Sequence, residues 1–149
     1  MGEHLRDVVD LLRSRGLRAT APRVAVLDVL GSLPGHPDAE AVRAAVVERL
    51  GSVSTQAVYD ILHTLTDAGL LRRIEPAGHP ARYETRVGDN HHHLICRSCG
   101  DTRDVDCDIA HAPCLEPSEG HDFAVDEAEV TFWGLCPACR TNTTTRGTA

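Results

Sequence analysis

A chain of 149 residues with 42% hydrophobic and only 3% aromatic residues is expected to form one domain or two small ones. No run approaches the roughly 18 uninterrupted apolar residues of a membrane helix, and the first ten residues lack the apolar core of a signal peptide. We therefore expect a cytoplasmic protein that does not enter a membrane. In a reducing compartment, its six cysteines are more typical of metal ligands or redox groups than of disulfides.

The net charge of −7 is distributed unevenly along the chain. Residues 1–86 carry eleven Arg and eleven acidic residues, whereas residues 87–149 carry four Arg and eleven acidic residues. This balance excludes non-specific nucleic-acid binding by the whole surface, but it allows a local Arg-lined face in the first half. We place a domain boundary in the polar stretch 86–90, which gives domains 1–86 and 87–140. The Thr-rich segment 141–149 is predicted to be a disordered tail.

The first domain is predicted to contain four helices followed by a hairpin. Apolar residues at helical spacing run over 4–15, from Thr20 through Leu30, from Asp38 through Leu50 and from Ser54 through Ala68, and Thr20, Asp38 and Ser54 are suitable N-caps. A three-residue turn joins the last two helices, as in a helix-turn-helix. Strands over 70–75 and 81–85, joined by a Pro-Ala-Gly-His-Pro turn, complete a winged helix.

Three polar side chains mark the start of the fourth helix as a DNA-reading element. Thr55, Gln56 and Tyr59 lie opposite its apolar stripe, near the helix N-terminus that such motifs insert into the major groove. Gln can pair with adenine, and Tyr can contact a thymine methyl group or a phosphate. The alternative to the helix-turn-helix is a simple pair of packed helices. The alternative to the wing is a solvated surface hairpin.

The second domain is predicted to hold strands over 91–96, 102–106 and 128–133, with an irregular or partly helical connection over 107–122. Two C-x-x-C units, Cys96/Cys99 and Cys136/Cys139, present thiolate pairs at the spacing that tetrahedral zinc prefers. We expect a structural four-cysteine zinc site. A redox pair is the weaker alternative because the strand-to-helix context of such a pair is missing, and a disulfide is another.

The strand over 91–96 has the pattern of a second metal site. Its period of two places His91 and His93 on one face and His92 on the other. The candidates for further ligands are His36 and Glu84 in the first domain. Such nitrogen and carboxylate ligands suit Fe(II), Mn(II), Ni(II) or Zn(II), so the ligand type alone does not select the metal. A metal that bridged two domains would fix the angle between them and would be regulatory.

Six segments in order, RATAPRVAVL, HPDAEAV, STQAVYDILHTLTDAGLLRR, ARYE, HHHLICRSCG and WGLCPAC, identify a resemblance to the ferric uptake regulator (Fur) family over about residues 5–140. The chain most resembles the actinobacterial FurA type, which accompanies catalase-peroxidase genes. The resemblance implies an α+β fold with an N-terminal winged helix-turn-helix and a C-terminal α/β dimerisation domain. It further implies a homodimer that binds AT-rich inverted repeats in double-stranded DNA when it is loaded with metal.

Position by position, the resemblance implies site residues in four sets. The regulatory Fe²⁺ site falls on His36, Glu84, His91 and His93, with Asp104 as a further ligand that could equally be a plain strand carboxylate. The structural zinc falls on Cys96, Cys99, Cys136 and Cys139. The DNA contacts fall on Thr55, Gln56 and Tyr59 for bases and on Arg18 and Arg23 for phosphates. A third metal site would use His92, His111, Glu127 and Glu129.

Two features depart from the family pattern. The strand before the last knuckle offers only Glu127 and Glu129 where many relatives have a His, which weakens the third site. The peroxide-sensing branch of the family, in which Fe²⁺ and peroxide oxidise a ligating His, usually has Asp where this chain has Glu84, so peroxide sensing is in doubt. Cys107 and Cys114 belong to neither knuckle and are either small semi-buried groups or a thiol switch.

We therefore expect a metal-dependent transcriptional repressor of oxidative-stress and iron-homeostasis genes, rather than an enzyme. The alternative within the family is a zinc- or nickel-responsive regulator. From other classes, the alternatives are a metalloenzyme with its ion on His91, His93 and Glu84, and a zinc-stabilised protein-interaction module. No general base or substrate pocket is marked in the sequence, and an interaction module leaves the Thr55, Gln56 and Tyr59 face unexplained.

Overall fold

The computed structural model describes residues 2–107 and 115–144. The chain divides into two compact units, one made of Met1–Glu75 and Pro80–Val87, the other of Pro76–His79 and Gly88–Ala149. The turn of the predicted hairpin thus belongs to the second unit, whereas sequence analysis assigned it to the first. None of the helices in the described ranges has the length and apolar character needed to span a membrane.

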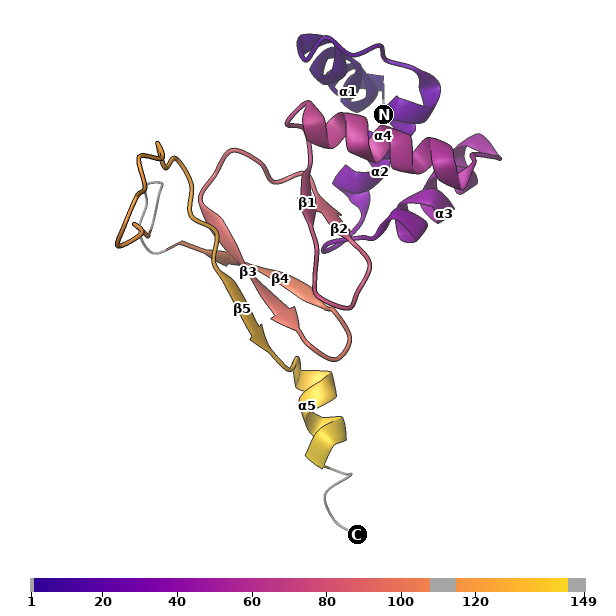
Figure 1. Ribbon diagram of the computed structural model, residues 1–149. Helices are drawn as coiled ribbons and strands as arrows, with labels where there is room; N and C mark the ends of the chain where they lie inside the picture. The colour runs from indigo at the N-terminus through magenta and orange to yellow at the C-terminus, as the bar shows by residue number, and fades with distance from the viewer. Residues whose placement is uncertain (1, 108–114, 145–149) are drawn as a thin grey trace. The chain divides into compact units, whose positions relative to one another are not determined.

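The first unit is a winged helix, as predicted (Figure 1). It consists of α1 (Gly2–Ser14), α2 (Ala21–Ser32), α3 (Ala39–Leu50) and α4 (Thr55–Asp67), followed by the antiparallel strands β1 (Arg72–Ile74) and β2 (Arg82–Glu84). The predicted N-caps begin α2, α3 and α4. The side chain of Asp38 accepts a hydrogen bond from the amide of Ala41, and that of Ser54 accepts one from Ala57, so local chemistry sets where α3 and α4 begin.

The hydrophobic core of the first unit is built from all four helices and the hairpin. The apolar stripe of α4 is buried on Val58, Ile61, Leu62 and Leu65, at the spacing that the sequence predicted. The central side chains with no exposed surface are Leu12, Val26, Val42, Val46, Leu62 and Leu65. This packing fixes α4 from one side and leaves its opposite face to solvent.

Strand β2 is anchored beside the segment that precedes α3. Tyr83 is buried and pairs with Arg73 of β1, and its amide donates a hydrogen bond to the carbonyl of Pro37 at 3.0 Å. An isolated bridge joins Asp38 to Arg82 in the same place. These backbone bonds bring the end of β2 close to the loop that carries His36.

The second unit contains a three-stranded sheet of order β4-β3-β5 (Figure 1). The central strand β3 (His91–Cys96) pairs antiparallel with β4 (Thr102–Asp106) and parallel with β5 (Thr131–Gly134). The first two strands lie where they were predicted, but β5 begins three residues later than the predicted 128–133. The amide of Val130 donates to the His92 side chain instead of to the sheet, which delays the start of regular pairing.

Helix α5 (Pro137–Thr144) follows β5 and starts inside the second cysteine pair. Proline is tolerated at this first helical position because its missing N–H would have no partner within the helix. The helix extends into the segment that sequence analysis assigned to a disordered tail from residue 141. Residues 145–149 of that segment lie outside the described ranges, as do residues 108–114 of the predicted irregular connection.

Candidate metal centres and nucleic-acid interface

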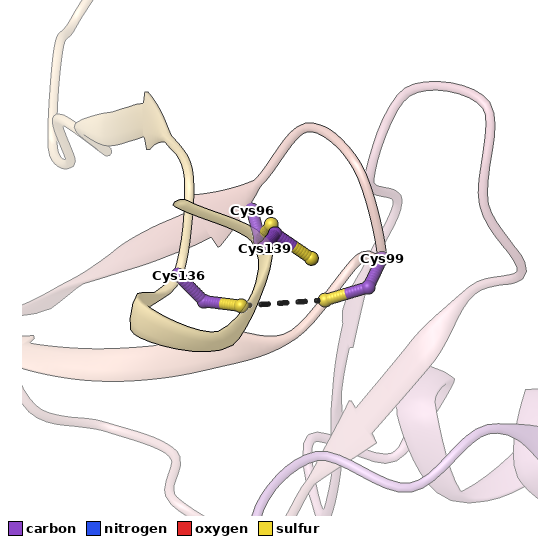
Figure 2. Close-up of side chains that lie close together, drawn as sticks. All are labelled: Cys96, Cys99, Cys136 and Cys139. Atoms are coloured by element: carbon purple, nitrogen blue, oxygen red, sulfur yellow. Dashed lines mark hydrogen bonds between the residues drawn. The ribbon is translucent and has the colours of Figure 1, made fainter. Parts of the chain in front are cut away.

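Four cysteine side chains converge in the second unit (Figure 2). Cys96 ends β3 and Cys99 lies in the turn that follows, whereas Cys136 immediately precedes α5 and Cys139 lies in its first turn. Their four sulfur atoms all lie within 4.8 Å of one another, and Sγ of Cys99 is 3.7 Å from Sγ of Cys136. A compact set of four soft sulfur donors fits tetrahedral zinc. The structure therefore brings together all four residues predicted for the structural site.

The four thiols do not share the same proton affinity. The backbone N–H of Cys136, with that of Cys99, lowers the pKa of Cys96 to about 6. The backbone N–H of Asp101 opposes the shift at Cys99, but the neighbouring thiol groups of the cluster, first Cys96, raise its pKa to about 12. At Cys139 the hydrogen bond to Ser98 opposes a rise in pKa that comes from Cys136 and from burial. One thiolate in the cluster thus makes the next one harder to form until a cation neutralises them.

Glycine is required in the first cysteine turn. The amide of Gly100 donates to the carbonyl of Cys96 at 2.9 Å, with Gly100 at a φ of +75° that disfavours other residues. A Cβ at this position would also lie 2.8 Å from the ring of His79. That ring has its Nε2 3.3 Å from the carbonyl of Arg97, so the turn of the wing hairpin packs directly on the cysteine turn.

The three consecutive histidines of β3 divide between its two sides, as the period of two predicts. His91 and His93 have side chains with no exposed surface, and their rings meet edge to face with centroids 4.9 Å apart. His92 is also buried, but its Nδ1 accepts a hydrogen bond from the amide of Val130 at 3.2 Å. One strand thus presents two neighbouring imidazoles on one face and a third imidazole with a backbone partner on the other.

Three carboxylates surround the pair of imidazoles. Asp104 is the direct β4 partner of His93 in the sheet, and its Oδ1 lies 3.6 Å from Nε2 of His93 and 3.9 Å from Nε2 of His91. On the far side of the rings, Asp89 Oδ1 lies 2.6 Å from Nδ1 of His91, and Glu129 Oε1 lies 3.4 Å from Nδ1 of His93. Two imidazole nitrogens and a carboxylate oxygen on one side suit a divalent ion such as Fe²⁺, Mn²⁺ or Zn²⁺.

The other two residues predicted for the regulatory site meet within the first unit. Nε2 of His36 lies 2.9 Å from Oε2 of Glu84, and the two side chains are only 6% and 5% exposed. Arg82 donates from its Nη1 to the carbonyl of His36 at 3.3 Å, which helps to fix the loop. A buried imidazole beside a buried carboxylate again offers nitrogen and oxygen donors to a metal.

The residues predicted for a third metal site have other neighbours where the structure describes them. His92 accepts the Val130 amide, and Glu129 lies against His93. Glu127 is exposed, and His111 lies outside the described residues. Of the two remaining cysteines, Cys107 is a partly buried free thiol, and Cys114 lies outside the described residues.

The predicted DNA-contacting residues lie on the exposed side of the winged helix. Thr55, Gln56 and Tyr59 face solvent at the start of α4, and Tyr59 is 50% exposed. Gln56 donates from Nε2 to Oδ1 of Asp60 at 2.8 Å, a contact that sequence analysis did not anticipate. Arg18 is exposed and Arg23 is partly exposed at the start of α2, where Nη1 of Arg23 donates to the carbonyl of Arg18.

Sequence analysis did not identify Asp89 as a partner of His91, and it grouped Glu129 with His92 rather than with His93. The available signal for Asp89 was its position two residues before His91 in a Gly-Asp-Asn turn, where a short acidic side chain can reach a neighbouring imidazole. Glu129 comes from a segment 36 residues further along the chain than His93. Its position depends on the parallel pairing of β5 with β3, which spacing alone does not predict.

Known proteins resemble this chain over nearly its full length. The transcriptional regulator FurA of Mycobacterium tuberculosis is 55% identical over 140 residues, covering 94% of this chain and 95% of that protein. The peroxide-responsive repressor PerR of Staphylococcus saprophyticus is 29% identical over 144 residues, covering 93% of each. The 55% identical relative confirms the predicted resemblance to the FurA type.

Solved structures of the same architecture include the ferric uptake regulator Fur of Vibrio cholerae. It superposes with a TM-score of 0.69 at 26% identity, covering 86% of this chain and 98% of that one. A zinc-bound manganese uptake regulator superposes with a TM-score of 0.66 at 25% identity, covering 87% and 98%. The model of the ferric uptake regulator family matches residues 14–133, and with the 55% identical relative it establishes that the chain belongs to the ferric uptake regulator family.

Proposed function

We propose that this protein is an Fe²⁺-dependent transcriptional repressor of catalase-peroxidase and iron-homeostasis genes in the cytoplasm. The observation that carries the proposal is a winged helix with an exposed polar reading helix in the same chain as two sets of histidine and carboxylate donors whose imidazoles are buried. Its similarity to a FurA and to a peroxide-responsive repressor supports the choice of genes. Loss of the metal, or its reaction with peroxide, would relieve the repression.

The two metals have separate roles in this proposal. Zn²⁺ binds Cys96, Cys99, Cys136 and Cys139 and stabilises the second unit, because zinc supplies folding energy to small metal-bound domains. Fe²⁺ is the regulatory metal and binds His36, Glu84, His91, His93 and Asp104. When bound, this ion supplies reactivity toward peroxide that leads to oxidation of a ligating histidine. The side chains of His36, Glu84, His91 and His93 are at most 6% exposed and are therefore largely desolvated before the metal enters, whereas Asp104 is 33% exposed.

DNA recognition is proposed to involve a homodimer on an AT-rich inverted repeat. Thr55, Gln56 and Tyr59 would contact base edges, and Arg18 and Arg23 would contact phosphates. Exposed apolar side chains on the sheet, Leu94 and Phe132, are 48% and 46% exposed and would be covered by the partner subunit. Because the phosphate contacts release counterions, operator binding should weaken steeply as the salt concentration rises.

Operator binding with and without Fe²⁺ under anaerobic conditions tests the proposal. We expect Fe²⁺ to tighten binding, and we expect both His36→Ala and His93→Ala to abolish that response because both side chains hold one shared ion. His121→Ala is the matched control, since that imidazole is 74% exposed and lies outside both donor sets. Operator affinity that ignores both the metal and the two variants would refute the proposal. If the two variants removed different metal ions, the proposal that His36 and His93 share one ion would be refuted.

The alternative within the family is a regulator that responds to zinc or nickel. The donor sets do not exclude either metal, and one structural relative is a zinc-bound manganese uptake regulator. The metal that restores operator binding to the chelated protein, at a free concentration that leaves the cysteine cluster filled, distinguishes these regulators. Mass spectrometry of His36 and His91 after peroxide treatment tests the second signal, and an added oxygen on either would support peroxide sensing despite Glu84.

A further inference from the structure

We propose that Asp89 is a positioning residue for the regulatory metal: its carboxylate holds the His91 ring so that Nε2 is the atom that binds the ion. This inference rests on the proposed regulatory site and adds a residue to it. It concerns a short contact within the second unit, where Asp89 Oδ1 lies 2.6 Å from Nδ1 of His91. Asp89 is not one of the predicted metal ligands.

The chemistry of a neutral imidazole links this contact to metal binding. A neutral ring carries one N–H, and a carboxylate can only accept a hydrogen bond, so the short contact places the proton of His91 on Nδ1. The lone pair is then on Nε2, the nitrogen that lies 3.9 Å from Asp104. Metal-binding histidines commonly donate their other N–H to a carboxylate in this way, which fixes the ring and increases its basicity.

The packing around His91 limits which of its two ring nitrogens can bind the metal. The His91 side chain has no exposed surface and meets the His93 ring edge to face, so it cannot rotate freely to offer its other nitrogen. The Asp89 side chain is 42% exposed and therefore remains in contact with solvent. We expect the carboxylate to act on the metal through the imidazole, so its effect should appear in the metal affinity rather than in the zinc cluster.

The other two histidines of β3 provide internal comparisons. Glu129 Oε1 approaches Nδ1 of His93 only to 3.4 Å, an ion-pair distance rather than a hydrogen bond, so we expect it to hold its ring less firmly than Asp89 does. His92 has the opposite arrangement, because its Nδ1 accepts the Val130 amide and its proton must then lie on Nε2. Adjacent residues of one strand should thus carry opposite tautomers.

Two measurements on the zinc-loaded, full-length protein test the proposal. Long-range ¹⁵N–¹H spectra recorded at mildly alkaline pH report which nitrogen of each imidazole carries the proton. We expect the Nδ1–H form for His91 and the Nε2–H form for His92. Asp89→Ala should remove the preference at His91, and Asp89→Asn should keep much of it because its amide oxygen still accepts.

Titration with Mn²⁺, followed by its paramagnetic resonance signal, measures the affinity of the regulatory site without iron chemistry. We expect Asp89→Ala to weaken Mn²⁺ binding by about 10- to 100-fold, with Asp89→Asn and Glu129→Ala between it and the wild type. Asp126→Ala is the matched control, an exposed carboxylate in the same unit. The backbone amide shifts of β3 verify that each variant is folded.

The outcomes separate this inference from the proposed function. Wild-type Mn²⁺ affinity in Asp89→Ala, or a His91 tautomer that does not depend on Asp89, would overturn the inference alone. If the wild-type protein bound no Mn²⁺, Fe²⁺ or other divalent ion beyond the zinc, the proposed regulatory site would fail, and with it the role of Asp89 in metal binding. A tautomer that changes together with a weaker Mn²⁺ affinity supports both.

Discussion

Removing zinc from the four-cysteine cluster is expected to unfold the second unit and leave the first unit folded. The basis is the distribution of the hydrophobic core. The core cluster of seventeen buried residues runs from Val8 to Tyr83 and lies entirely in the first unit. Among the described residues of the second unit, the buried apolar side chains are only Pro76, Ile95 and Cys96. The second unit therefore lacks the usual source of stability.

The magnitudes favour the metal as the main source of stability in the second unit. Full burial of one Ile side chain contributes about 1.5 to 3 kcal/mol. Binding of a structural zinc in small metal-dependent domains contributes roughly 10 to 16 kcal/mol at neutral pH. Even if the partner subunit covers Leu94 and Phe132, each of these adds only a further few kcal/mol. The free energy lost with the zinc should therefore exceed the stabilisation that the rest of the second unit supplies.

Hydrogen exchange measured by mass spectrometry is the assay. After zinc removal, verified by metal analysis, amides in β3 and β4 should exchange at the rate of an unfolded chain, while those in α2 to α4 keep their protection. Cys136→Ser should reproduce this pattern in the presence of zinc. Cys107→Ser is the control, because that free thiol lies outside the cluster. Unchanged protection of β3 and β4 in the zinc-free protein, at two protein concentrations, would refute the reasoning.

Three further predictions concern the caps, the thiols and β3. Ser54→Ala should lower the free energy of unfolding of the first unit by about 1 kcal/mol in a denaturant titration, whereas Thr20→Ala should cost less because the Thr20 side chain makes no cap hydrogen bond. Zinc binding must displace protons from Cys99 and Cys139, whose pKa values are raised. Each displaced proton adds about tenfold per pH unit, so competition titrations near neutral pH should show zinc affinity rising at least about 100-fold per pH unit, and a slope of zero would contradict this. His92→Leu should lower the thermal stability without changing the number of divalent ions bound.

The elements of the first unit could be predicted from the sequence because their local signals agree with the packing. The caps Asp38 and Ser54 begin their helices where expected, and the apolar stripe of α4 is the face that is buried. The signals were weaker in the second unit. Strand β5 begins late because Val130 bonds to a side chain, and α5 was not expected because its sequence is polar and contains Pro137.

The cysteine cluster was predictable because the C-x-x-C spacing is itself the geometry of the site. The surroundings of the β3 histidines were not predictable to the same degree. Asp104 faces His93 through strand register, and Glu129 approaches it through a parallel pairing between distant segments. Sequence periodicity predicts which face a side chain lies on, but it does not state which carboxylate from another segment will reach it.

The last prediction concerns His92, which has either a structural role or a role as a metal ligand, and substitutions at this position distinguish the two. In the structural role, the contribution of His92 to stability comes from its Nδ1, which accepts the Val130 amide at 3.2 Å. Leu then leaves that donor without its acceptor, at a cost of about 1 to 3 kcal/mol, at the low end because the bond is only partly buried. Asn, whose side-chain oxygen lies near the position of Nδ1, should restore part of the stability. A metal ligand in a third site would behave differently, since both His92→Leu and His92→Asn would then remove one bound ion. Metal analysis alongside thermal unfolding of the two variants decides between them, and a lost ion would refute the structural role.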